Sequence, residues 1–567
     1  MKHERNLTRL LSLLLIVALL LSLTACTQPP APSTDPAGTT LGTVPTVPTT
    51  APTTQPTEPT TEPTIPPTEP PQPDDQLHNL EYTLTQEDID EFYRLLDECE
   101  KLAIAGEDMD AIEEISDQLD DQLEYLYGQN SIAMIIYYND MDKVANEERH
   151  LEVTEICTDA SDAYTQAVRR IYLSETPARD MLFEGWTEKD IDMLLKYDER
   201  IAELQQRNSE IEVDYRTATS DDVKIPLYIE FIQNNNEIAQ IYGYENYYTY
   251  AYDVVYERDY GIEEVELMRQ LSKDYLTVAL GKYLGTFNRL FNGMKPFEQN
   301  NIVSFLYNKY TTLYTDYFGK YMEVAPGNLK QETENMLNND SLFSEEANAM
   351  AGAFTTTIGE RSYCYFGPEY SSVTTVIHEA GHYYASRYAD LGSIPLDLAE
   401  THSQGNEWLF LANVGNSMKK NEYSATVSYL MYNNVAMIMI CLMVDEFEQK
   451  VYSTDVSAYT AADFDALMDS IVTQYFDLSY AEANITDVNA YWRAVVVEQP
   501  IYYISYAVSS VAAMDLYTIA QGDFAAAAEI YRKLCEEPIE DGGFLESISA
   551  AGLTGPFDEA FYKKLGG

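Results

Sequence analysis

The stretch His378-Glu379-Ala380-Gly381-His382 decides how the rest of the chain is interpreted. In an α-helix, residues four apart lie on one face, so His378 and His382 can offer two imidazoles to one ion. Glu379 lies about 100° round the helix from His378, too far to bind that ion but near a water beside it. The whole chain has only six histidines, so this spacing rarely arises by chance. The alternative is a helix whose histidines are merely packed.

A second helix is predicted to supply a third ligand. Hydrolytic zinc sites have three protein ligands and one open position. Glu400 follows His378 by 22 residues, with Gly392 as a helix stop and Pro395 as a helix start between them. We therefore expect a helix–turn–helix unit that projects His378, His382 and Glu400 inward. The predicted cap of the first helix is Ser371 or Ser372. Its predicted buried face consists of Val373, Val376, Ile377 and Ala380.

The N-terminus has the pattern of an export signal. Three basic side chains precede an apolar run from Leu10 to Leu23, which is short for a membrane-spanning helix. The run ends in Leu23-Thr24-Ala25-Cys26, which resembles the lipobox of bacterial lipoproteins. The resemblance implies a signal peptide over 1–25, cleavage before Cys26 and a lipid on its sulfur. An ordinary signal peptide with an incidental cysteine is the alternative.

Residues 26–76 are predicted to form a tether. Fifteen of the chain's 24 prolines fall between Thr27 and Pro73, among threonines and glutamines, which excludes a packed core there. Such a composition favours a semi-rigid polyproline II stalk. Together with the lipid, it predicts a protein anchored to the cell membrane on its extracytoplasmic face.

Helical patterns begin after the tether and define a predicted N-terminal helical region over 77–224. Thr85 and Asp88 form a capping box before a periodic run to Ala105. The further helices are expected at 108–127, 142–173 and 187–216. With 93 acidic and 35 basic side chains the formal charge is −58, which disfavours nucleic acid or an anionic bilayer surface as a partner. Contact with the membrane is therefore expected through the lipid anchor only.

Three segments between residues 225 and 567 carry a resemblance to a known family. Asn236 to Tyr247 is similar to "RxxIAxxxGYxNY", with a helix expected to end at Gly243. Leu398 to Glu407 is similar to "LAExxSxxNE", and Pro500 to Tyr506 to "PFYYxxYA". These are patterns of the M3 peptidase family, which comprises zinc metallopeptidases such as thimet oligopeptidase and oligoendopeptidase F.

The resemblance implies roles for single residues. It gives Glu400 the role of third ligand to one zinc ion per chain, while His402 points nearly opposite on the same helix. Glu407, two turns beyond Glu400, is either an acceptor for a ligand histidine or a plain surface charge. Tyr503 and Tyr506 are the expected donors to the oxyanion of the tetrahedral intermediate, with packed aromatics as the alternative.

One feature departs from the family's pattern. Its members usually carry a histidine a few residues before these tyrosines, and this chain has no histidine after His402. The positions in question hold Val495 and Pro500. Loss of one such donor typically lowers turnover by about 10²–10³-fold without abolishing it.

The fold implied is mainly α-helical, with two helical halves around a deep substrate channel. A small β-hairpin is expected beside the metal helix, since β-prone Thr355-Thr356-Thr357-Ile358 precedes a turn near Gly359. Its edge strand could pair with a substrate backbone or be purely structural.

The function implied is that of an extracytoplasmic zinc metalloendopeptidase in which Glu379 is the general base for hydrolysis of oligopeptides. The main alternative is a surface lipoprotein of the same fold that binds peptides with weak or no catalysis. A dipeptidase similar to angiotensin-converting enzyme is a third possibility.

Overall fold

The computed structural model describes residues 72–566 except 107, 308–313, 369, 371, 390, 477–487, 498 and 540–541. The predicted signal peptide, Cys26 and nearly all of the predicted tether lie outside the described residues. The protein is mainly helical with small sheets, so the predicted fold class is confirmed. The predicted substrate channel stays a prediction.

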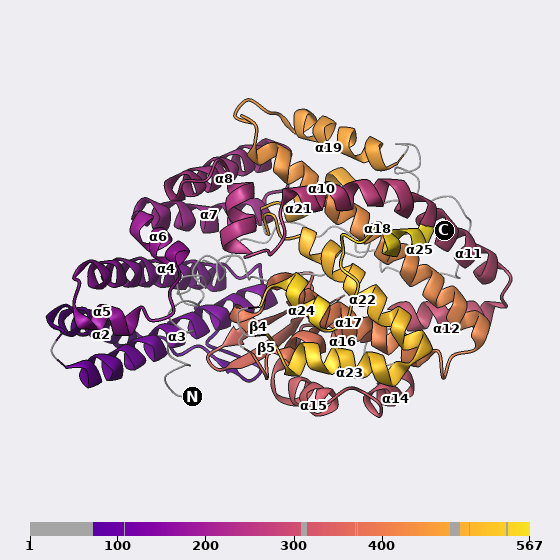
Figure 1. Cartoon of the computed structure of the whole chain (residues 1–567), viewed down its shortest axis with the longest axis horizontal. Helices are drawn as coiled ribbons and strands as arrows, with labels where there is room; N and C mark the ends of the chain where they lie inside the picture. The colour runs from indigo at the N-terminus through magenta and orange to yellow at the C-terminus, as the bar shows by residue number, and fades with distance from the viewer. Residues whose placement is uncertain are drawn as a thin grey trace, which may run out of the picture.

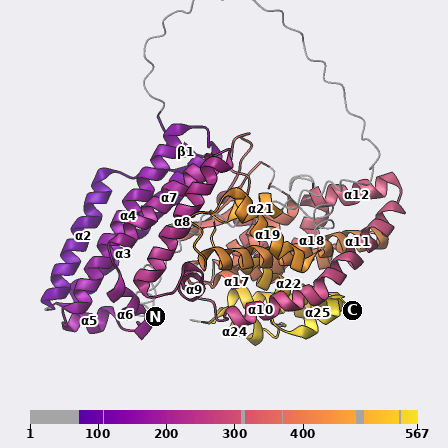
Figure 2. The same ribbon diagram turned by 90° about the horizontal axis from the view of Figure 1, so that it is seen from above.

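Two groups of helices lie side by side along the longest axis of the molecule (Figures 1 and 2). The N-terminal group packs around an apolar cluster that runs from Phe92 to Leu194. A second core runs from Ile201 of the N-terminal group to Leu565 of the larger group, so the two groups share it. The N-terminal helices are α2 (Gln86–Ala105), α3 (Met109–Asn139), α4 (Val144–Leu173), α5 (Pro177–Leu182), α6 (Glu188–Lys196), α7 (Arg200–Thr217) and α8 (Asp221–Tyr242).

The second group begins after Gly243, which ends α8 as predicted, with φ 93° in the left-handed region that glycine favours. Its first helices are α9 (Tyr247–Tyr250), η1 (Ala251–Val255), α10 (Ile262–Leu271), η2 (Ser272–Leu276), α11 (Thr277–Asn292), α12 (Pro296–Tyr307), η3 (Tyr314–Phe318), α14 (Gly319–Met322) and α15 (Leu329–Asn339). The later ones are α16 (Val373–Ala385), η4 (Leu391–Ser393), α17 (Leu396–Val414), α18 (Lys420–Tyr452), α19 (Ala461–Tyr475), α21 (Val488–Val495), α22 (Ile504–Gly522), α23 (Phe524–Glu536), α24 (Phe544–Ala550) and α25 (Glu559–Gly566).

A three-stranded sheet lies between the two groups, beside α16 (Figure 1). The predicted hairpin is present as β4 (Ala353–Ile358) and β5 (Arg361–Phe366), which pair antiparallel. A strand that was not predicted, β3 (Ser341–Phe343), runs parallel to β5, so the strand order is β3-β5-β4. The remaining pair, β1 (Gln76–Leu77) and β2 (Leu80–Glu81), precedes α2.

The capping box at Thr85 and Asp88 is confirmed, but two predicted helix boundaries are wrong. The helix expected over 108–127 extends to Asn139, because the apolar run Ile132–Tyr138 continues it and packs against the sheet. The helix expected over 187–216 is broken between α6 and α7. There the Asp198 carboxylate accepts a hydrogen bond from the Arg200 backbone N–H (2.9 Å), a turn that competes with helix.

The helix with the two histidines also ends earlier than Gly392, at Ala385. Ser386 follows, and its hydroxyl donates to the Tyr383 carbonyl (2.7 Å) and accepts from the Ser362 hydroxyl of β5 (2.8 Å). Such side-chain bonds compete with continued helix. Pro395 stands directly before α17, as predicted.

One helix in the described part of the chain, α18, is long and apolar enough to cross a membrane. Two thirds of its apolar window is buried inside the protein, and it packs against α11 and α22. It is therefore a core helix of the larger group. The five cysteines after Cys26 are buried free thiols, as expected for small apolar residues.

Candidate metal centre

The α16 helix presents its ionisable residues in the protein interior. The Ser372 hydroxyl caps it by accepting a hydrogen bond from the Thr375 backbone N–H (3.2 Å). Ser371, the other predicted cap, lies outside the described residues. His378 and His382 share one face, with ring centroids 5.1 Å apart, and both are buried.

A close approach of α16 and α17 brings Glu400 to this face. A Cβ atom on Gly381 would lie 2.6 Å from the His402 carbonyl oxygen, so only glycine fits at the crossing. One turn before Gly381, the Ile377 carbonyl accepts a hydrogen bond from the Asn406 side chain of α17 (2.7 Å). The small residue and the amide bond together fix how the two helices face each other.

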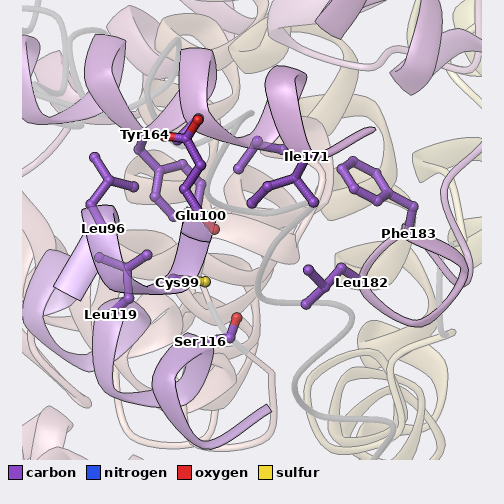
Figure 3. Close-up of a pocket in the computed structure, with 11 residues that line it drawn as sticks. Leu96, Cys99, Glu100, Ser116, Leu119, Tyr164, Ile171, Leu182 and Phe183 are labelled. Carbon is purple, nitrogen blue, oxygen red and sulfur yellow. The ribbon is translucent and has the colours of Figure 1, made fainter. Parts of the chain in front are cut away.

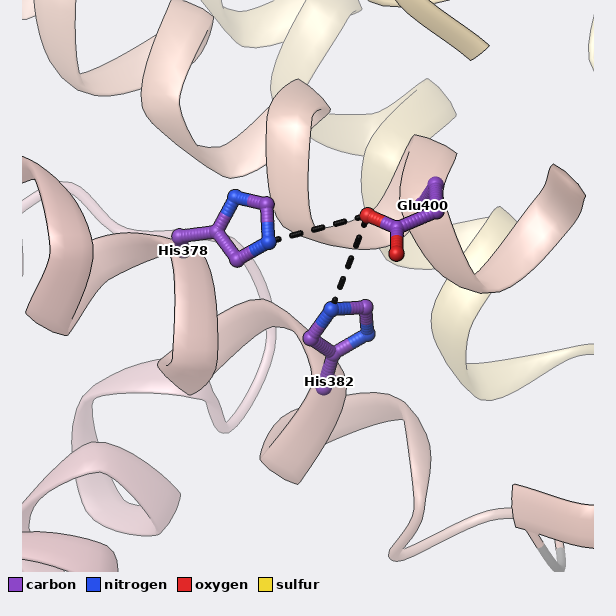
Figure 4. A group of neighbouring side chains, drawn as sticks. All are labelled: His378, His382 and Glu400. Atoms are coloured by element: carbon purple, nitrogen blue, oxygen red, sulfur yellow. Dashed lines mark ion pairs between the residues drawn. The ribbon is translucent and has the colours of Figure 1, made fainter. Parts of the chain in front are cut away.

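The three predicted ligands meet at one point (Figure 4). Glu400 Oε2 lies 3.6 Å from His378 Nε2 and 3.8 Å from His382 Nε2. Ligands of a tetrahedral zinc ion at bond lengths of 2.0–2.2 Å are about 3.3–3.5 Å apart, close to these separations. The His382 Nε2 atom is buried with no hydrogen-bond partner among the described residues, as expected of an atom aimed at a metal. Two imidazoles and one carboxylate therefore fit a divalent ion such as zinc.

Residues of the second helix support the ligands. Glu407 Oε1 lies 2.7 Å from His378 Nδ1, so the Nδ1–H group donates and Nε2 keeps its lone pair for a metal. The Ser403 hydroxyl donates to Glu400 Oε2 (3.1 Å). Burial alone would lower the pKa of His378, but the bond to Glu407 and the nearby carboxylates raise it to about 9. Burial holds the pKa of His382 well below its usual value.

Glu379 lies beside this group without entering it. Its Oε2 accepts a hydrogen bond from the Thr355 hydroxyl of β4 (2.8 Å), while its buried Oε1 has no hydrogen-bond partner among the described residues. Burial raises the pKa of Glu379 to about 8. A carboxylate with one oxygen held and the other unengaged is suited to accept a proton from a water molecule.

His402 is occupied elsewhere, as its position on α17 predicts. Its Nε2–H donates to the Leu534 carbonyl of α23 (3.1 Å), and burial lowers its pKa to about 4. A neutral imidazole bonded to another helix does not compete with Glu400 for the metal.

The tyrosine that reaches the centre is one that sequence reasoning missed. The Tyr502 hydroxyl donates to Glu400 Oε1 at 2.5 Å. The two predicted tyrosines, Tyr503 and Tyr506, are buried beside it, with ring centroids 6.0 Å and 5.3 Å from that of Tyr502. Of the two positions where the resemblance leads us to expect a histidine, Val495 is a buried apolar side chain, and the carbonyl of Pro500 accepts a hydrogen bond from Tyr256 (2.7 Å).

A pocket between the N-terminal helices has no histidine in its lining and so does not resemble the metal centre (Figure 3). Its two acidic or phenolic groups are already bonded, Glu100 to Arg170 (2.5 Å) and Tyr164 to Asp120 (3.2 Å). The rest of the lining is largely apolar, so it reads as a gap between packed helices. The lining residues are Leu96, Cys99, Glu100, Ser116, Leu119, Tyr164, Ala167, Val168, Ile171, Leu182 and Phe183.

Comparisons with known proteins place the fold. A Bacillus anthracis protein described as an oligoendopeptidase F superposes with a TM-score of 0.65 at 15% identity, over 87% of this chain and 97% of the other. The inhibitor-bound structure of PZ peptidase A gives 0.65 at 14% identity, over 85% and 97%. A further structure described as an oligoendopeptidase F gives 0.63 at 15% identity, over 85% and 96%.

No family model and no curated protein matches the sequence. The structural likeness spans nearly the full length of those chains. At these identities it shows the fold, which is that of the oligoendopeptidase F structures.

Proposed function

We propose that this chain is a zinc-dependent endopeptidase that hydrolyses oligopeptides. The observation that carries the proposal is the convergence of His378, His382 and Glu400, with Glu379 directly beside them. Two histidines and one glutamate are the ligands of known hydrolytic zinc sites, and the chain has the fold of structures that are described as peptidases.

The mechanism assigns one task to each group. When bound, zinc polarises the scissile carbonyl and lowers the pKa of a water molecule. Glu379 takes a proton from the attacking water and passes it to the leaving amine. Thr355 holds the Glu379 carboxylate in place through its hydrogen bond to Oε2. Tyr503 and Tyr506 are proposed to donate hydrogen bonds to the developing oxyanion.

The test is hydrolysis of a mixed peptide library by the purified protein, followed by mass spectrometry. Glu379→Gln should keep zinc but lose activity by about 10²–10⁴-fold, because the general base is gone. A chelator should abolish cleavage, and added zinc should restore it. A fully active Glu379→Gln protein would contradict the mechanism.

The second candidate is a surface lipoprotein that binds peptides without cleaving them. The observation in its favour is that no histidine follows His402, and the positions where the resemblance leads us to expect one hold Val495 and Pro500. Peptides that bind with no products, in the presence of one zinc per chain, would favour this candidate.

We also propose that Cys26 carries the lipid and holds the protein on the extracytoplasmic face of the membrane. The basic start, the apolar run and the Leu23-Thr24-Ala25-Cys26 sequence support this. Cys26→Ser should move the protein from the membrane fraction to the medium or a soluble fraction and stop incorporation of labelled fatty acid. Peptides are the proposed partners, and the charge of −58 argues against nucleic acid.

A further inference from the structure

The carboxylate of Glu400 is held from both sides, and each oxygen has a different neighbour. Oε2 faces the two imidazoles and accepts from the Ser403 hydroxyl. Oε1, the other carboxylate oxygen drawn in Figure 4, accepts from the Tyr502 hydroxyl at 2.5 Å. We infer that Tyr502 is a positioning residue that confines Glu400 to one-oxygen ligation and thereby sets the metal affinity of the centre. This inference rests on the proposed function.

The contact joins a buried hydroxyl to a buried carboxylate. Tyr502 and Glu400 are 1% and 0% exposed, so water does not compete for either group. Short bonds from a hydroxyl to a carboxylate are about twice as strong as bonds between neutral groups. An oxygen that is engaged in this way is withheld from the metal, and the plane of the carboxylate is fixed.

The backbone before α22 is built to aim Tyr502. Ile501 has φ 62°, in the left-handed region that a β-branched residue rarely adopts. Such a conformation persists only where its surroundings enforce it. Three buried hydrogen bonds do so: Ile501 N–H to Glu448 (2.8 Å), Arg258 to the Ile501 carbonyl (2.8 Å) and Tyr256 to the Pro500 carbonyl (2.7 Å).

Arg258 connects this turn to the helix that carries Glu400. Its side chain is fully buried, with its guanidinium 4.4 Å from the ring centres of both Tyr252 and Tyr256. It also lies 3.9 Å from the carboxylate of Asp397, in the first turn of α17. One cation therefore contacts both the turn that aims Tyr502 and the start of the helix that positions Glu400.

The experiment measures metal binding by the full chain. Tyr502→Phe removes one oxygen atom and keeps the packing of the ring. The Zn²⁺ dissociation constant, from competition with a chelator, should rise by about 10-fold, within the usual range for groups that hold metal ligands. The visible absorption of the Co²⁺-substituted protein should shift, because Glu400 Oε1 becomes available to the ion.

The matched control is Tyr562→Phe. Tyr562 is equally buried, and its hydroxyl donates to the Pro556 carbonyl (2.7 Å) in the C-terminal segment. Tyr562→Phe removes a phenolic hydroxyl, as Tyr502→Phe does, but from another part of the core. Its zinc affinity and Co²⁺ spectrum should equal those of the wild type.

A second variant, Arg258→Lys, keeps the Tyr502 hydroxyl and the Glu400 carboxylate and weakens the support of the turn and of the start of α17. It should weaken zinc binding in the same direction but by less than Tyr502→Phe. If Tyr502→Phe fails to fold, unchanged zinc affinity in folded Arg258→Lys overturns the inference. Wild-type protein that does not bind one zinc would instead refute the proposed function. Normal wild-type binding with unchanged affinity and spectrum in Tyr502→Phe refutes only the role of Tyr502.

Discussion

Helices α2 and α16 are built on opposite principles. In α2, one face is buried through residues such as Phe92 and Leu95, and charged side chains of the other face pair in water. In α16, every residue from Thr375 to Ala385 is buried, although two of them are histidines and one is a glutamate. Burying ionisable groups is costly unless they are paired or bind a metal. The comparison teaches that buried histidine and glutamate side chains identify the candidate metal centre better than the apolar periodicity of a helix does.

The largest effect should come from Gly381→Ala, where α16 meets α17. The added methyl would collide with backbone atoms of His402 and Ser403, at 2.6 Å and 2.7 Å, which no side-chain rotation can relieve. We expect destabilisation of about 3 kcal/mol or more and loss of zinc, measured by urea unfolding and metal analysis.

The control is Gly285→Ala, in the middle of α11. Nothing lies within 4 Å of its added methyl, so helix propensity alone should stabilise the fold by about 0.5–1 kcal/mol. Equal unfolding midpoints for the two variants would show that the helix crossing is not tight.

The smallest effect should come from Arg94→Ala on α2. Arg94 pairs with Glu91 (2.7 Å) and Glu98 (2.5 Å), and all three side chains are about half exposed. Exposed pairs of this kind contribute little to stability. We expect no measurable change in unfolding midpoint, zinc content or activity. A large loss in any of the three would break the contrast drawn between the two helices.

The sequence was sufficient for the parts of the centre that depend on spacing within a helix. The four-residue spacing of His378 and His382 put both on one face of α16, and the seven-residue spacing put Glu407 on the side of Glu400. The segment from Leu398 to Glu407 contains two further polar residues with a role at the centre. Ser403 bonds to Glu400, and Asn406 bonds to the α16 backbone, so its polar residues connect the ligands to the fold.

The sequence was insufficient where the backbone leaves regular structure. The resemblance to "PFYYxxYA" points to Tyr503 and Tyr506, whereas the tyrosine that contacts Glu400 is Tyr502, which precedes the start of α22 at Ile504. Ile501, directly before Tyr502, has a left-handed conformation, and no local pattern predicts that conformation in a β-branched residue. The break between α6 and α7 was missed for a similar reason, a single side-chain bond from Asp198.

Zinc content of Glu400→Ala tests the central claim most directly. The purified wild type should hold one zinc per chain. Glu400→Ala should bind zinc more than about 100-fold more weakly, because loss of a group that only supports a ligand already lowers metal affinity by about 10–100-fold. Glu266→Ala, which removes an exposed carboxylate of α10, should bind zinc like the wild type. Wild-type affinity in Glu400→Ala would contradict the account, because the convergence of the two imidazoles with the carboxylate would then have no bearing on the metal.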